Sequence, residues 1–123
     1  MDISHKLLQQ RIRNRIIDNL ESFADPDWVN KLGTDEIIEM WHDIMDNNET
    51  FEFFSEPVFT RKELNAIKKF HYLLMSSYKH IPTTWQQEEL QNNNNWAELV
   101  KIAREVLDVF MSRGRFSEDR EMT

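Results

Sequence analysis

Glu39 and His42 are the two side chains whose types and spacing most resemble a chemical site. The Glu-x-x-His spacing places both on one face of a helix, as in the helices of di-iron carboxylate bundles. Such a centre needs a second copy of the motif, and the stretch that ends at His71 has Lys68 where the second glutamate would stand. A cationic side chain there opposes a metal ion. The sequence therefore predicts no metal or other cofactor, and the preferred interpretation is an exposed acid beside a surface histidine.

The residues of nucleophilic and acid–base catalysis form no known motif. The chain has no cysteine, no G-x-S-x-G sequence, and only two glycines, which are too few for a phosphate-binding loop. His71 and His80 are separated by about two and a half helical turns and would point apart. The sequence predicts a protein that is not an enzyme. An unrecognised site around Glu39, His42 and His71 is the third alternative for function.

Acidic residues are concentrated in one region of the chain. The net charge is −7, and residues 25–58 contain ten acids and a single base, Lys31. Such a block repels phosphate backbones and attracts basic proteins. Arg11, Arg13 and Arg15 alternate and so spread around a helix, which favours a solvated face over an RNA-binding stripe. A basic protein partner is predicted, and nucleic acid is not.

Residues 46–58, DNNETFEFFSEPV, combine four acids with three phenylalanines. The asparagine and proline content predicts an irregular connection, with a short strand left open. Three phenylalanines cannot all be buried by a short irregular segment, and an exposed aromatic anchor ringed by carboxylates is typical of a binding surface. The predicted partner-binding residues are Asp43, Asp46, Glu49, Phe51, Glu52, Phe53, Phe54 and Glu56.

Helices must position this segment. Glycine and proline are scarce, and apolar residues recur at helical spacing through most of the chain. The pattern predicts an all-α fold, a single compact bundle of about five helices. The expected helices cover residues 3–23, 26–32, 61–78 and 96–113, with a further helix that is capped by Thr34 and fades at Asn47 and Asn48. One or two turns are expected after Thr83 or Thr84.

Capping residues mark several of the expected helix ends. Thr60 and Glu63 form a capping box, and Asn95 with Glu98 is a second candidate pair. Gly33 and Gly114 are expected to end helices. The four tryptophans are expected mostly in the core. We expect residues 1–114 to form the domain and residues 115–123 to form a flexible polar tail.

The chain is expected to be cytoplasmic. The lack of cysteine suits a reducing compartment. Charged residues interrupt the first apolar stretch, which is therefore expected to be neither a signal peptide nor a membrane span, and no membrane association is predicted.

The segments FTRKELNAIKKFHYLL, IPTTWQQEEL and NNNNWAELVKIAREVL, with the acidic, cysteine-free and helical character of the chain, resemble helical immunity proteins of bacterial toxin/immunity pairs. The family includes those of contact-dependent growth inhibition. This resemblance implies an antitoxin that neutralises a cognate toxin, usually a basic nuclease, by tight stoichiometric binding. The alternative is a helical protein–protein adaptor or regulator without an inhibitory role.

Overall fold

The computed structural model describes residues 3–46, 48 and 50–122, and all regular structure in them is helical. The all-α prediction of about five helices is confirmed, and no strand occurs in these ranges. The elements are α1 (His5–Ala24), α2 (Asp27–Leu32), α3 (Thr34–Asp46), α4 (Arg61–Ser77), η1 (Tyr78–His80), η2 (Gln87–Leu90) and α5 (Asn94–Met111). None of the helices in the described part of the chain is apolar over a length that could span a membrane.

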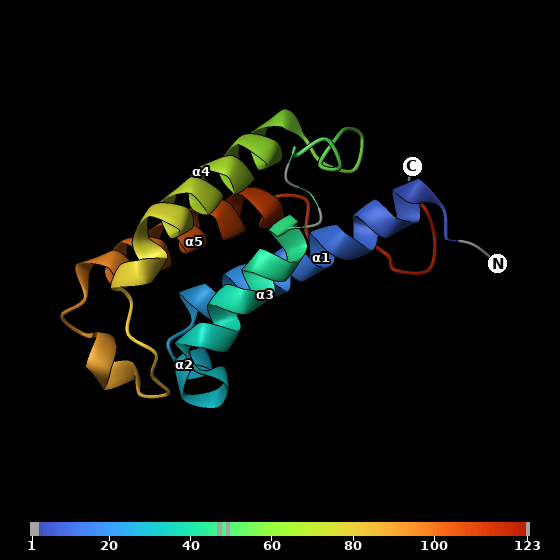
Figure 1. Cartoon of the computed structure of the whole chain (residues 1–123). Coiled ribbons are helices and arrows are strands. Elements are labelled where there is room, and N and C mark those ends of the chain that lie inside the picture. Colours follow the sequence, from blue (N-terminus) through green and yellow to red (C-terminus); the bar gives the residue numbers. More distant parts are fainter. Residues whose placement is uncertain (1–2, 47, 49, 123) are drawn as a thin grey trace.

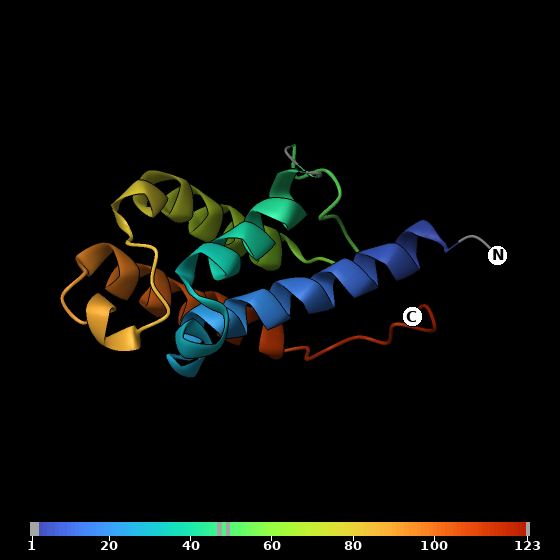
Figure 2. The same ribbon diagram turned by 60° about the horizontal axis from the view of Figure 1, so that its bottom comes forward.

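Helix α1 is the central helix of the bundle. Helices α3 and α5 both pack against it, and α4 packs on α5 (Figure 1). The described ends of the chain lie together, near the first turns of α1, because the segment after α5 runs back along that helix (Figure 2). The irregular segment between α3 and α4 lies at the same end of the molecule.

Aromatic rings from four helices meet at the centre of the core. The Phe70 ring of α4 packs edge-on against Trp41 of α3, at 4.7 Å between centroids, and against Phe23 of α1, at 4.9 Å. Trp96 of α5 lies 5.7 Å from Phe23. All four side chains are at most 3% exposed. The apolar positions that recur at helical spacing thus join α1, α3, α4 and α5.

The helix ends follow their capping residues. The Thr60 and Glu63 capping box is confirmed at the start of α4. Gly33 and Gly114 follow α2 and α5 with φ of 81° and 72°, conformations that favour glycine. The predicted cap of α5 at Asn95 is wrong, because Asn93 Oδ1 accepts the Trp96 backbone N–H and the helix begins at Asn94.

Trp85 departs from the predicted burial of the tryptophans. Its side chain is 58% exposed, whereas Trp41 and Trp96 are buried and Trp28 is half-buried. The Trp85 ring lies against the backbone of Gly33, where a Cβ atom would approach its Cε2 atom to 2.7 Å. Gly33 therefore serves both the backbone turn and this close aromatic contact.

The C-terminal segment, expected to be a flexible polar tail, is hydrogen-bonded to α1 as far as Met122. Asn14 donates to the Phe116 carbonyl and accepts its N–H, at 2.8 and 3.0 Å. Gln10 donates to the carbonyls of Ser117 and Arg120 and accepts the N–H of Met122. Thr123 lies outside the described residues. Polar side chains on α1 thus form the hydrogen bonds that water would form with the backbone of a free tail.

Candidate functional site

A buried ion-pair cluster connects three helices at the end of the bundle where the irregular segment between α3 and α4 lies. Arg13, whose side chain is fully buried, pairs with Glu63 at 2.7 Å, and Arg113 pairs with the same carboxylate. Glu63 also accepts the Thr60 backbone N–H as part of the capping box. The expectation that the arginines of α1 form a solvated face is therefore wrong for Arg13. One carboxylate joins α1, the start of α4 and the end of α5.

Two guanidinium groups enclose the Phe116 ring. The Arg13 Cζ atom lies 4.0 Å from the ring centroid and the Arg113 Cζ atom lies 4.9 Å from it. Arg13 also donates to the carbonyls of Phe110 and Gly114. Its Nε atom is buried without a hydrogen-bond partner, which the aromatic contacts partly offset.

Electrostatics within this cluster favour the ionised carboxylate. Burial opposes the charge of Glu63, but hydrogen bonds from Arg13, Arg113 and the Thr60 backbone outweigh it and hold the pKa of Glu63 below its usual value of 4.5. Glu63 is therefore ionised in the folded protein at neutral pH.

The same cluster anchors the irregular segment between α3 and α4. Arg113 donates to the Val58 carbonyl at 2.6 Å. Gln9, buried on α1, donates to the Phe53 carbonyl at 2.7 Å and to the Ser55 hydroxyl at 3.2 Å. The segment is irregular but attached to α1 and α5 at several points.

The three phenylalanines of this segment do not form the exposed anchor that was expected. Phe54 is 1% exposed and belongs to the core, where its ring contacts Phe59 at 5.1 Å. Phe51 and Phe53 are half-buried and pack against the same core. Gln9 and Arg113 bind the backbone on either side of Phe54, whose side chain lies in the core.

The carboxylates of the predicted site do lie on the surface. Asp43, Asp46, Glu52 and Glu56 are exposed, whereas Glu49 lies outside the described residues. Glu36 and Glu39 extend the group, because Glu36, Glu39, Asp43 and Asp46 follow one another at three- and four-residue spacing on the exposed face of α3. We call these four residues the α3 acidic stripe. Its spacing can be read from the sequence, but in the sequence Glu39 stands out only as one half of a metal motif.

Most carboxylates of this surface have no cationic partner in the part of the chain that the structure describes. Among the described residues, no ion pair involves Glu36, Glu39, Asp46, Glu52 or Glu56. Like charges at helical spacing destabilise a helix by roughly 0.2–0.5 kcal/mol for each pair. The stripe therefore raises the free energy of the isolated fold, and a cationic partner would relieve that cost.

Tyr72 supplies the exposed aromatic ring that the phenylalanines do not. Its side chain is 59% exposed and its ring lies 6.1 Å from that of Phe51. Phe51 in turn packs edge-on against His71 at 5.6 Å and lies beneath the Lys68 ammonium. The backbone of Phe51 is left-handed, with φ of 63°, a conformation that costs a non-glycine residue on the order of 1 kcal/mol. Tyr72 was missed because its position on α4 gives no signal of a neighbouring loop.

His71 joins this aromatic group to α3. Its Nδ1 atom accepts the Trp41 indole N–H at 3.2 Å. Burial lowers the pKa of His71 below its usual value of 6.5, and the neighbouring His42 lowers it further, while Asp46 opposes both effects. His71 is therefore largely neutral at pH 7, as the hydrogen bond to Nδ1 requires.

The residues considered for metal binding and catalysis are only partly assembled. Glu39 and His42 line a hollow of about 550 Å³ with Asp35, Glu36, Ile38 and Tyr78. No group of three or more His, Cys, Asp or Glu side chains in the described ranges is placed to hold a metal ion. His71 uses its Nδ1 atom for Trp41. The arrangement provides a carboxylate-lined surface and no recognisable nucleophile with its base.

The comparisons with known proteins give no assignment to set beside this geometry. No family model matches the chain, and neither the curated proteins nor the solved structures include a significant match.

Proposed function

We propose that the chain binds a basic protein through the α3 acidic stripe and the carboxylates Glu52 and Glu56 of the segment that follows α3. The observation that carries this proposal is a group of exposed carboxylates, of which Glu36, Glu39, Asp46, Glu52 and Glu56 form no ion pair with another described residue. Such a group costs stability in the free protein and gains favourable energy only against cationic groups. Stability of the fold alone gives no reason for it.

The mechanism combines charge steering with a small aromatic contact. Exposed carboxylates attract a basic partner over about one Debye length, roughly 8–10 Å at physiological ionic strength, and so raise the association rate. Tyr72, exposed beside Phe51, is the ring that a partner would cover. Tyrosine is enriched among the side chains that contribute most to binding energy.

Within this class we propose the specific function of an immunity protein, which neutralises a basic toxin domain of nuclease type by stoichiometric binding in the cytoplasm. The supports are the acidic surface, the cysteine-free composition and the resemblance of the sequence segments to helical immunity proteins. A nuclease has a basic face toward its substrate, and an acidic protein competes for that face. The second candidate is an adaptor that uses the same surface without inhibiting its partner.

Affinity capture with matched charge variants tests the proposal. The wild-type chain and two triple variants are immobilised and exposed to extract of the source cell at low and at physiological salt. One variant neutralises the surface (Glu36→Gln, Glu39→Gln, Glu52→Gln). The control removes the same charge from exposed acids elsewhere (Glu88→Gln, Glu89→Gln, Glu98→Gln). The captured protein is identified, purified and assayed with increasing amounts of the chain.

We expect a basic protein whose affinity falls more than about tenfold in the surface variant and less than about twofold in the control. Inhibition that is complete at a 1:1 ratio supports the immunity function, and binding without inhibition supports the adaptor. An equal loss of affinity in both triple variants would refute the assignment of this surface as the binding site. An affinity that neither variant changes would refute it as well.

A further inference from the structure

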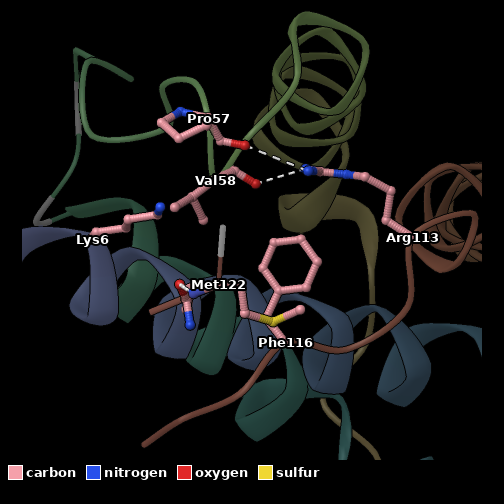
Figure 3. A pocket seen from close by; sticks show the side chains of 7 residues that line it. Lys6, Pro57, Val58, Arg113, Phe116 and Met122 are labelled. Atoms are coloured by element: carbon pink, nitrogen blue, oxygen red, sulfur yellow. Dashed lines mark hydrogen bonds between the residues drawn. The ribbon is translucent and has the colours of Figure 1, made fainter. Parts of the chain in front are cut away.

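A second surface feature lies where α1, the segment before α4 and the C-terminal segment meet. It is a hollow of about 340 Å³, within the range of roughly 300–1,000 Å³ typical of small-molecule sites. The lining residues are Lys6, Gln10, Pro57, Val58, Arg113, Phe116 and Met122. Lys6 and Arg113 approach it from opposite sides, with Phe116 and Met122 on the α1 side (Figure 3).

The lining is chemically divided. Pro57, Val58, Phe116 and Met122 give it apolar walls. Lys6 and Arg113 are the charged groups among the described lining residues, which include no carboxylate. The hollow therefore combines apolar walls with two cationic groups, in a protein whose total charge is −7.

Among the residues that the structure describes, the positive charge at this hollow is not cancelled. Glu63 neutralises one of the two arginines that it joins, so the buried cluster keeps an excess of one positive charge. Lys6 is half-buried and forms no ion pair or hydrogen bond with another described residue. Glu56 and Glu121 adjoin lining residues in sequence, but both are exposed and neither lines the hollow.

The two cationic groups of the hollow also have hydrogen-bond donors that are not fully used. The Nη1 group of Arg113 has two hydrogens and forms one long bond, 3.4 Å, with the Pro57 carbonyl. The Lys6 ammonium has three donors without a described partner. The Gln10 amide is already used, because it donates to Ser117 and Arg120 and accepts from Met122. The free donors are thus cationic.

We propose that this hollow binds a small apolar monocarboxylate. Its carboxylate accepts hydrogen bonds from Lys6 and Arg113, and its ring or short chain packs on Phe116, Val58 and Met122. Inorganic phosphate matches the charge but would leave the apolar walls in contact with water. The ligand would bridge α1 and the C-terminal segment, so binding stabilises the attachment of that segment.

Methyl NMR on the full chain, labelled at the methionine methyl groups, tests the proposal with benzoate as the probe. Benzamide has the same ring without the charge, and inorganic phosphate has charge without a ring. The Met122 signal is assigned with Met122→Leu. Lys6→Gln removes the free ammonium, and Lys62→Gln makes the same change on the exposed face of α4 as a control.

We expect benzoate to shift the Met122 signal in a saturable way, with weaker binding of benzamide. Lys6→Gln should weaken benzoate binding roughly fivefold, the upper end for a partly exposed ion pair, whereas Lys62→Gln should leave it unchanged. Any of three results would overturn the proposal: no saturable shift, benzamide binding equal to benzoate, or phosphate binding tighter than benzoate. Unchanged affinity in Lys6→Gln would remove Lys6 from the site and refute the assigned charge contact.

Discussion

The two halves of α1 are buried by different interactions. The second half presents Ile16, Ile17, Leu20 and Phe23 to the core, all at most 1% exposed. The first half buries polar side chains to a similar degree: Gln9, Gln10, Arg13 and Asn14 are at most 4% exposed. Apolar packing is non-directional and tolerates changes of partner, whereas each polar side chain requires a particular acceptor or donor. The first half therefore holds specific segments in place.

Those segments are the two irregular stretches of the chain near the candidate sites. Gln9 binds the backbone at Phe53, while Gln10 and Asn14 bind the C-terminal segment. Irregular backbone has no ladder of its own, and its polar groups must be satisfied by side chains or water. The polar half of α1 thus holds two irregular segments in place. One is the segment between α3 and α4, and the other is the C-terminal segment, which lines the small hollow.

The largest effect is expected from Glu63→Gln on α4, which removes the charge partner of Arg13 in the polar half of α1. The substitution keeps the side-chain size but leaves Arg13 buried without its counter-charge. Removing one partner of a buried pair costs about 3–5 kcal/mol, and we expect a loss of that size in urea unfolding. The pKa of Glu63 is lowered, so its contribution is complete above about pH 4.5 and is lost as the pH falls through the folded-state pKa. The free energy of unfolding of the variant should therefore lack the part of its pH dependence that comes from Glu63.

Leu20→Ala is the matched change in the apolar half. It should cost about 2–5 kcal/mol through cavity formation while leaving the acid sensitivity of the wild type intact. If both variants show the same dependence on pH, the ion-pair cluster does not contribute in the manner described.

A smaller effect is expected from Asn14→Ala, which releases the C-terminal segment alone. The substitution removes both hydrogen bonds to the Phe116 backbone and should cost about 1–3 kcal/mol. Hydrogen exchange should accelerate at the Phe116 amide and remain unchanged in the centre of α5. Asn65→Ala, on the exposed face of α4, is the control. Unchanged exchange at Phe116 would show that other contacts hold the segment.

The sequence predicted the apolar half and missed the polar one for physical reasons. Helical spacing of Leu20 and Phe23 reveals a core face, and Thr60 with Glu63 is a local motif whose partners lie three residues apart. Arg13 and Asn14 give no comparable signal, because they bind backbone groups about a hundred residues away. Burial of Phe54 could not be predicted either, because it results from packing against the core of the folded chain.

The candidate site, too, could be predicted only in part. Its carboxylates are exposed because charged side chains remain in water unless paired, so Asp46 and Glu52 could be expected at the surface. Tyr72 could not be expected beside Phe51, because only the folded chain brings α4 to that segment.

The smallest effect concerns His71, which links α3 to the aromatic group. Its folded-state pKa lies below 6.5, so the unfolded chain binds more protons between that pKa and about pH 6.5. Stability should therefore rise with pH across this interval. NMR titration should give a His71 pKa below 6.5, with the Trp41 indole N–H signal changing in the same step. Asp46→Asn should lower the pKa further, and a pKa at or above 6.5 would refute the assignment.

The central claim is that the α3 acidic stripe binds a basic protein, and the association rate with the captured partner tests it most directly. Stopped-flow measurements from about 10 to 150 mM salt should give an association rate that falls about tenfold or more, with a nearly constant dissociation rate. The surface variant (Glu36→Gln, Glu39→Gln, Glu52→Gln) should associate more slowly and with a smaller salt dependence than the wild type, because Asp43, Asp46 and Glu56 keep their charges. An association rate that is insensitive to salt in the wild-type chain would contradict the claim.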